Sequence, residues 1–199
     1  APLVARHPSL SLELVAEARH ASLVRREADL AIRPSKFSHQ DVVQRQIGTI
    51  EFGLYASDGY LARHGMPDFA AGCAGHVLIA MTDDVGNVAD REWLPPITSR
   101  ARVAVRTNGR EPMATMAAAG MGVTCLPRYV GDGTPGLRLL PTPTPAPRRS
   151  LFIGVHREAR TTPRVRATLH HIAESFGLLG RALCPSGTSP AETRTPPAR

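Results

Sequence analysis

The stretch ARVAVRTNGREPMATMAAAGMGVTCL, residues 101–126, decides the fold. Residues 101–107 separate apolar from basic side chains at alternate positions, which is typical of a strand. Residues 111–121 predict a helix, because Asn108 offers a cap and the proline at 112 falls in the first turn. The apolar residues 122–126 then predict a buried strand. A strand, a helix and a strand in this order indicate a parallel βαβ unit.

The first part of the chain predicts a second unit of this kind. A short helix ends at Pro8, residues 11–15 alternate like a strand, residues 20–27 favour a short helix, and residues 28–33 form an apolar strand. Two βαβ units predict an α/β protein whose parallel sheets are covered by helices.

Two extended segments could carry the chain between two lobes. Residues 42–57 are rich in β-branched and aromatic side chains, which favours a long strand. Strands are also predicted at 137–140 and 150–156, separated by a proline-rich stretch that favours extended backbone. We expect these segments to be the outward and return crossovers.

The rest of the sequence predicts individual helices and strands. Asp58 offers an N-cap for a short helix that ends at Gly65, and residues 77–82 predict a strand. Apolar residues at helical spacing predict a final helix over 164–183. The residues after Cys184 are polar and proline-rich, and we expect them to be disordered.

Charge and cysteine content exclude several classes of protein. The net charge is +7, but the cations are scattered arginines with Lys36 as the sole lysine, so a DNA-tracking surface is not expected. The three cysteines lack the spacing of a disulfide framework or a zinc site. The eight histidines show no metal-ligand spacing, so we expect neither a metal nor a cofactor. No transmembrane or secretory pattern is visible, which favours a cytoplasmic location.

Four segments together resemble a known family. They are LVARHPSLSLELV (3–15), READLAIR (26–33), LYASDGYLARHGMP (54–67) and VRTNGREPMATMAAAGMGVTCLP (105–127). In this order they are similar to the effector-binding domain of LysR-type transcription regulators, over residues 1–177. The resemblance implies a periplasmic-binding-protein-like (type 2) α/β fold, with two Rossmann-like lobes joined by two crossover strands.

The resemblance also implies a domain organisation. Lobe I would comprise residues 1–53 and 157–180, lobe II residues 54–156, and a disordered tail residues 181–199. The family's winged helix-turn-helix and linker helix are not among these residues, nor is the first strand of lobe I. We therefore expect the chain to meet DNA only through a DNA-binding domain that it lacks.

Candidate effector contacts lie where strands end and helices begin. In a doubly wound sheet, ligands bind beyond the carboxyl ends of strands, where helix N–H groups favour an anion. In lobe II these positions are Thr107, Asn108 and Gly109. Asn108 could instead serve only as the helix cap, and Thr124 could add a hydroxyl.

In lobe I the corresponding positions are Arg33 and Pro34, which the resemblance places in the cleft. Arg33 could pair bidentately with a carboxylate effector or form a surface ion pair. Ala18, after the preceding predicted strand, is a further candidate.

The function implied is ligand sensing without catalysis. An effector would shift the arrangement of the lobes and so the geometry of a homodimer or tetramer, which controls transcription. One alternative is a solute-binding protein of the same fold, for which no export signal is visible. An enzyme would need a nucleophile elbow or a phosphate loop, and neither is present. The third alternative is a truncated remnant of a regulator.

Overall fold

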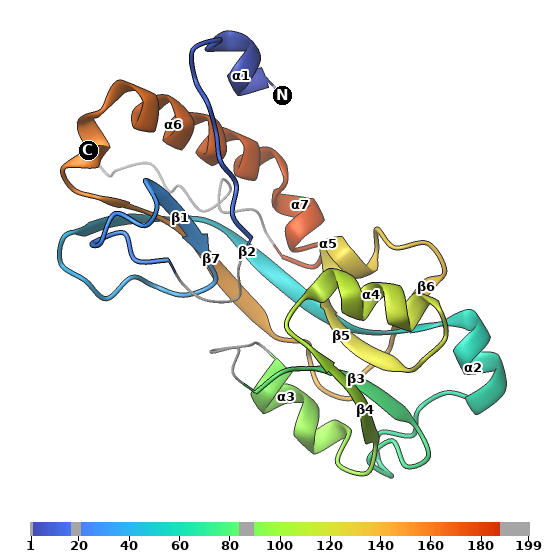
Figure 1. The fold of residues 1–199 in the computed structure, drawn as a ribbon. Coiled ribbons are helices and arrows are strands. Elements are labelled where there is room, and N and C mark those ends of the chain that lie inside the picture. Colours follow the sequence, from blue (N-terminus) through green and yellow to red (C-terminus); the bar gives the residue numbers. More distant parts are fainter. Residues whose placement is uncertain (1, 17–20, 84–89, 188–199) are drawn as a thin grey trace, which may run out of the picture. The chain divides into compact units, whose positions relative to one another are not determined.

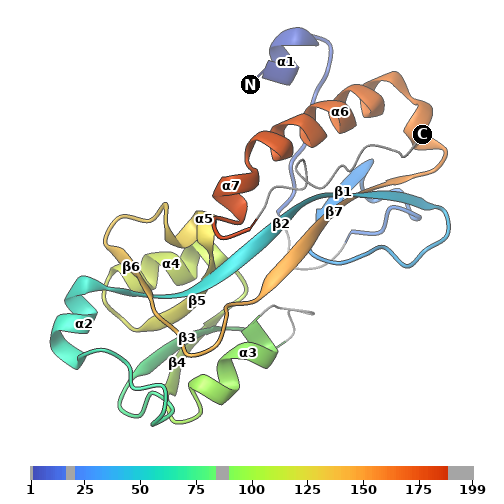
Figure 2. The same cartoon turned by 180° about the vertical axis from the view of Figure 1, so that it is seen from behind.

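We describe the protein from a computed structural model that covers residues 2–16, 21–83 and 90–187, with Asp90 described by its backbone only. The chain divides into two compact units. Unit 1 comprises residues 1–49, 150–181 and 187–199, and unit 2 comprises residues 50–149 and 182–186. The figures show the elements within each unit (Figures 1 and 2).

Unit 2 contains a mixed sheet built around the predicted βαβ unit. The strands β4 (Arg102–Thr107) and β5 (Val123–Pro127) lie parallel on either side of β3 (Val77–Met81), and α4 (Arg110–Ala118) connects them. The prediction of a parallel unit at 101–126 is confirmed. Figure 1 shows α4 and α5 (Arg128–Gly131) beside β5.

The far edge of this sheet is antiparallel. The second half of β2 (Val42–Ser57) pairs with β5 on one side and with β6 (Leu137–Leu140) on the other. A core of fully buried side chains from these elements, including Ile79, Met113 and Leu126, holds α4 against the sheet. Burial of such aliphatic side chains stabilises the unit by about 1.5–3 kcal/mol each.

Two helices in unit 2 differ from the sequence prediction. The N-cap of the helix α2 (Asp58–His64) is Ser57, whose hydroxyl accepts a hydrogen bond from the Tyr60 amide. Asp58 is the first residue of the helix itself. The predicted cap Asp58 is therefore wrong, although the end at Gly65 is confirmed. The helix α3 (Asp90–Ile97) was not predicted, because Pro95 and Pro96 within it disguise a helical pattern.

Unit 1 has a three-stranded arrangement with β7 between its neighbours. The strand β1 (Leu30–Arg33) pairs antiparallel with β7 (Arg148–His156). On its other side, β7 neighbours β2. The predicted parallel unit at 11–33 is wrong. Residues 11–15 form no strand, and residues 23–26 form turns in which Arg26 has a φ of 57°.

Among the described residues, the helices of unit 1 are α1 (Pro2–Arg6), α6 (Pro163–Leu178) and a short helix η1 (Ala159–Thr161). Figure 2 shows α6 beside β7 and β1. Val165 on α6 is buried. The predicted final helix is interrupted at Leu179 and resumes as α7 (Gly180–Leu183).

Both crossover predictions are confirmed in outline. The chain passes from unit 1 to unit 2 within β2, between Thr49 and Ile50, and returns within β7, between Arg149 and Ser150. The predicted disordered tail starts too early, because Leu183 and Cys184 are buried and Ser186 is hydrogen-bonded in unit 2. Residues 188–199 lie outside the described residues.

Candidate functional site

The predicted contacts of lobe II lie at the start of α4, in unit 2. Gly109 is the N-cap, in an extended conformation, and no side chain caps the helix. The interpretation of Asn108 as the cap is therefore wrong, since its side chain is exposed and one residue too early. The Thr107 hydroxyl accepts a hydrogen bond from the Gly109 amide at 3.4 Å. Because Gly109 has no side chain, the first turn of α4 has no side-chain cap.

Arg110, the first residue of α4, was not predicted. Its guanidinium donates to the carbonyl oxygen of Cys125 at 2.8 Å and lies 5.4 Å from the centre of the Phe52 ring. These contacts bind the helix start to β2 and β5. The sequence gives no signal for this role, because Arg110 resembles the other scattered arginines.

Thr124 lies inside the sheet. Its side chain is fully buried, and its hydroxyl donates to the Ile79 carbonyl oxygen at 3.0 Å. The residue is paired with Ile79 in the parallel ladder of β3 and β5. The arrangement gives this hydroxyl a structural role between two strands.

The predicted contacts of lobe I lie in unit 1. The Arg33 guanidinium turns back onto its own loop, where it donates to the carbonyl oxygen of Ser35 at 3.2 Å and covers the Phe37 ring at 3.9 Å. Burial lowers the pKa of Arg33. Pro34 is exposed, and Ala18 lies outside the described residues.

A cavity of about 960 Å³ in unit 1 is bordered by Arg33. Its other walls come from residues 10–15, from β1 and from α6. Leu12, Leu14 and Ile32 are among the apolar residues that line it. Of the predicted lobe I contacts, the structure thus places Arg33 at a cavity and Pro34 on the surface.

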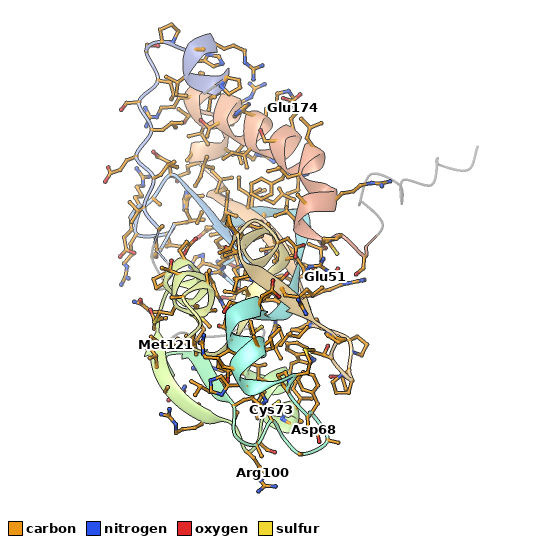
Figure 3. All side chains as sticks on the ribbon, turned by 90° about the vertical axis from the view of Figure 1, so that its right-hand side faces the viewer. Glu51, Asp68, Cys73, Arg100, Met121 and Glu174 are labelled. Atoms are coloured by element: carbon orange, nitrogen blue, oxygen red, sulfur yellow. The ribbon has the colours of Figure 1, made fainter. Side chains whose placement is uncertain are left out.

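Unit 2 also contains a buried polar network that the sequence did not predict. The Glu51 carboxylate on β2 is 6% exposed and accepts hydrogen bonds from the Ser186 amide at 3.3 Å and from the Cys184 thiol at 3.4 Å. Arg128 Nη1 lies 3.3 Å from one oxygen of this carboxylate, and Arg148 Nε lies 3.6 Å from the other. Figure 3 labels Glu51.

The pKa of Glu51 reflects two opposing causes. Burial by itself raises the pKa, but the hydrogen bonds from Ser186 and Cys184 and the charge of Arg148 outweigh burial and leave the pKa below its usual value. The carboxylate is therefore ionised and holds the segment 182–186 within unit 2.

The network continues through Asp132. Arg128 Nε lies 2.9 Å from one Asp132 carboxylate oxygen, and the Tyr55 hydroxyl donates to the other at 2.6 Å. Burial and the Asp132 carboxylate raise the pKa of Tyr55 far above its usual value. Tyr55 is therefore a neutral donor inside the core.

A second buried group surrounds Tyr60. Its hydroxyl accepts from the Val77 amide at 2.9 Å and lies 3.2 Å from His76 Nδ1, and the His64 ring stacks on the tyrosine at 4.5 Å. Because the hydroxyl proton is free to point at His76, this arrangement suits a neutral imidazole. Burial, and then the nearby His64, lower the pKa of His76.

The cysteines suit structural roles. All three are buried. Cys73 has a φ of 58°, and its thiol donates to the Ile97 carbonyl oxygen at 3.1 Å. Burial and the charge of Asp68, which Figure 3 labels near it, raise the pKa of Cys73. A thiol with a raised pKa is a poor nucleophile at neutral pH.

Neither a cluster of metal-ligating side chains nor a membrane-spanning helix is found among the described residues. Within residues 2–16, 21–83 and 90–187, no group of three or more histidine, cysteine, aspartate or glutamate side chains could hold a metal ion. Over the same ranges, no helix has the length and apolar character needed to cross a membrane.

A protein-family model matches most of the chain. The family model described as the LysR substrate binding domain matches residues 1–177. The chain therefore belongs to this family, and its fold is the mixed α/β fold of LysR regulatory domains.

Among curated proteins, the chain is similar to the HTH-type transcriptional regulator CrgA of Neisseria meningitidis serogroup C. The two are 28% identical over 131 residues, which are 64% of this chain and 43% of CrgA. The chain thus matches less than half the length of this relative.

Solved structures show the same fold. The CrgA regulatory domain from Neisseria meningitidis superposes with a TM-score of 0.73, at 22% identity over 88% of this chain and 89% of that one. The regulatory domain of the C227S variant of AphB from Vibrio vulnificus has a TM-score of 0.66, at 18% identity over 88% of each chain.

Proposed function

We propose that the chain is the ligand-sensing domain of a LysR-type transcription regulator, that it binds a small organic anion, and that it performs no catalysis. Membership of the LysR substrate binding domain family supports a sensing role. The start of α4 is the observation that carries the choice of an anion, since its N–H groups lack a side-chain cap.

The contacts differ in what they would contribute. The backbone from Thr107 to Gly109 would receive the anion, with the exposed Asn108 amide beside it. Arg33 would have to leave its contacts with Ser35 and Phe37 before it could pair with a carboxylate. Thr124 would act only by keeping β3 and β5 in register.

The signal would pass to DNA through oligomer geometry. In this proposal the effector shifts the population of domain arrangements, and a homodimer or tetramer transmits the shift to DNA-binding domains outside these residues. A coupling of about 1–3 kcal/mol would be sufficient.

A thermal-shift screen of the purified chain against small carboxylates, aromatic acids and amino acids tests the proposal. A bound anion stabilises the fold by about 2.7 kcal/mol at a hundred times its dissociation constant. The shift should fall with Asn108→Ala and Arg33→Ala but persist with Arg102→Ala, an exposed arginine on β4. A cooperative melt without a shift for any anion would contradict the proposal.

A further inference from the structure

Unit 1 contains a second concave surface, which shares no lining residue with the cavity bordered by Arg33. This groove of about 950 Å³ is lined by β2, β7, η1 and α6. Its apolar lining includes Ile153 and Val155 of β7, which are 2% and 3% exposed, and Leu169 of α6. We call this surface the α6 groove.

The charged side chains of the α6 groove are all basic. Arg45 on β2, Arg160 on η1 and Arg166 on α6 line it and are exposed. No aspartate or glutamate is among its lining residues in the described part of the chain. Three arginines from three elements therefore face one space that contains no compensating carboxylate.

These arginine side chains also lack partners elsewhere. Within the described residues, the side chains of Arg45, Arg160 and Arg166 make no hydrogen bond or ion pair. By contrast, Arg26, also in unit 1, is paired with Glu158 at 2.8 Å. His170, which also lines the groove, lies 3.2 Å from the Glu174 carboxylate. Figure 3 labels Glu174 on α6.

We propose that the α6 groove binds an amphipathic organic anion, namely a carboxylate with an aliphatic body. Its volume lies within the range of about 300–1,000 Å³ that is usual for small-molecule sites. The aliphatic body would cover Ile153, Val155 and Leu169, and the carboxylate would pair with the arginines. A small inorganic anion would leave the apolar surface uncovered, and a neutral lipid would leave the arginines unpaired.

Decanoate is a suitable probe, at concentrations far below those at which it forms micelles. Isothermal titration of the 199-residue chain should show saturable binding. The triple variant Arg45→Gln, Arg160→Gln, Arg166→Gln should weaken binding about tenfold, which corresponds to about 1.4 kcal/mol. Leu169→Ser should weaken it to a similar extent by removing apolar contact.

The control variant is Arg100→Gln, Arg102→Gln, Arg181→Gln, which removes the same charge from exposed positions outside the groove. Its affinity for decanoate should stay within about twofold of the parent. Decanol, which has the same body without the charge, should bind at least about tenfold more weakly, and acetate should not bind. Melting curves of every variant should remain cooperative.

Several results would overturn this proposal. Among them are no binding of decanoate, equal weakening in the control triple variant, and equal affinity for decanol. The proposal does not depend on the effector site, so Asn108→Ala should leave decanoate affinity unchanged. Loss of decanoate binding in that variant would place the probe at α4 and contradict the assignment to the α6 groove.

Discussion

The two units bury their apolar side chains to different degrees. In unit 2, Leu54, Ile79 and Leu126 are fully buried, whereas Leu14 in unit 1 is 91% exposed and Val15 is 68% exposed. The alternating pattern at 11–15 is as regular as that at 101–107, but only the second segment forms a strand. Alternation thus predicts a strand only where a neighbouring strand supplies backbone hydrogen bonds.

The polar groups follow the same division. Unit 2 buries Glu51 and His76 with defined partners, while the ion pairs of unit 1 lie mainly on the surface. Buried polar groups are costly unless every partner is present, whereas surface ion pairs contribute little. We therefore expect substitutions in unit 2 to have larger effects than equivalent ones in unit 1.

The largest expected effect is that of Gly131→Ala in unit 2. A Cβ atom at this position would lie 2.3 Å from the Tyr55 ring, which is itself buried in the core. We expect a loss of about 2–3 kcal/mol in the free energy of unfolding, measured by urea denaturation. Gly59→Ala is the control, because the nearest atom there is the end of the Arg63 side chain at 3.7 Å.

Gly154→Ala sharpens this comparison between units. Its Cβ would meet the Phe37 ring at 2.6 Å, but Phe37 packs in a small cluster with Leu23 and Val42. The ring has more freedom to move there, so we expect a loss of about 1 kcal/mol. A loss as large as that of Gly131→Ala would show that the two cores are equally rigid.

Glu51→Gln should cost about 2 kcal/mol at neutral pH, since it removes the charge that faces Arg128 and Arg148. The folded-state pKa of Glu51 lies below its usual value of 4.5, so its stabilising effect is present above this pH and is lost as pH falls below it. Urea denaturation from pH 7 to pH 3 should show the parent and Glu51→Gln converging in stability. Parallel curves would contradict the role of the carboxylate.

Arg33→Ala should cost about 1 kcal/mol, because its contacts with Ser35 and Phe37 lie in a partly exposed loop of unit 1. Lys36→Ala, at an exposed position of the same loop, is the matched control and should have no measurable effect. A cost above that of Glu51→Gln would reverse the order of the two units.

His76 should give the smallest effect, and its direction follows from its lowered pKa. Because the folded-state pKa lies below 6.5, the unfolded chain binds this proton first, and stability declines as pH falls below 6.5. The slope for one group cannot exceed about 1.4 kcal/mol per pH unit. His76→Gln should remove this component between pH 7 and pH 5, as seen in a series of melting curves, while His7→Gln should not.

The parts of the fold that could be predicted from the sequence are those with local signals. The βαβ unit at 101–126 and the crossover at 42–57 follow from side-chain alternation, helix-forming residues and β-branched content. Helix caps were less predictable. Ser57 and Asp58 are both good capping residues, and Asn108 and Gly109 are adjacent, so backbone conformation decides between them.

The buried network around Glu51 could not be predicted from the sequence, because its members are distant along the chain. Glu51 and Ser186 are separated by 135 residues and meet only through folding. Ser186 lies in a polar, proline-rich segment whose composition predicts disorder. The buried Glu51 carboxylate accepts hydrogen bonds that order this segment. Local composition cannot reveal a partner so distant along the chain.

The strand β2 runs through both units with one uninterrupted backbone. Residues 43–46 are exposed in unit 1, whereas residues 50–57 are buried in unit 2. Since side chains alternate with a period of two, deleting one residue near Gly48 would invert the facing of one half relative to the other. This junction should consequently tolerate substitutions far better than insertions or deletions, and length variation among natural relatives should fall elsewhere in the chain.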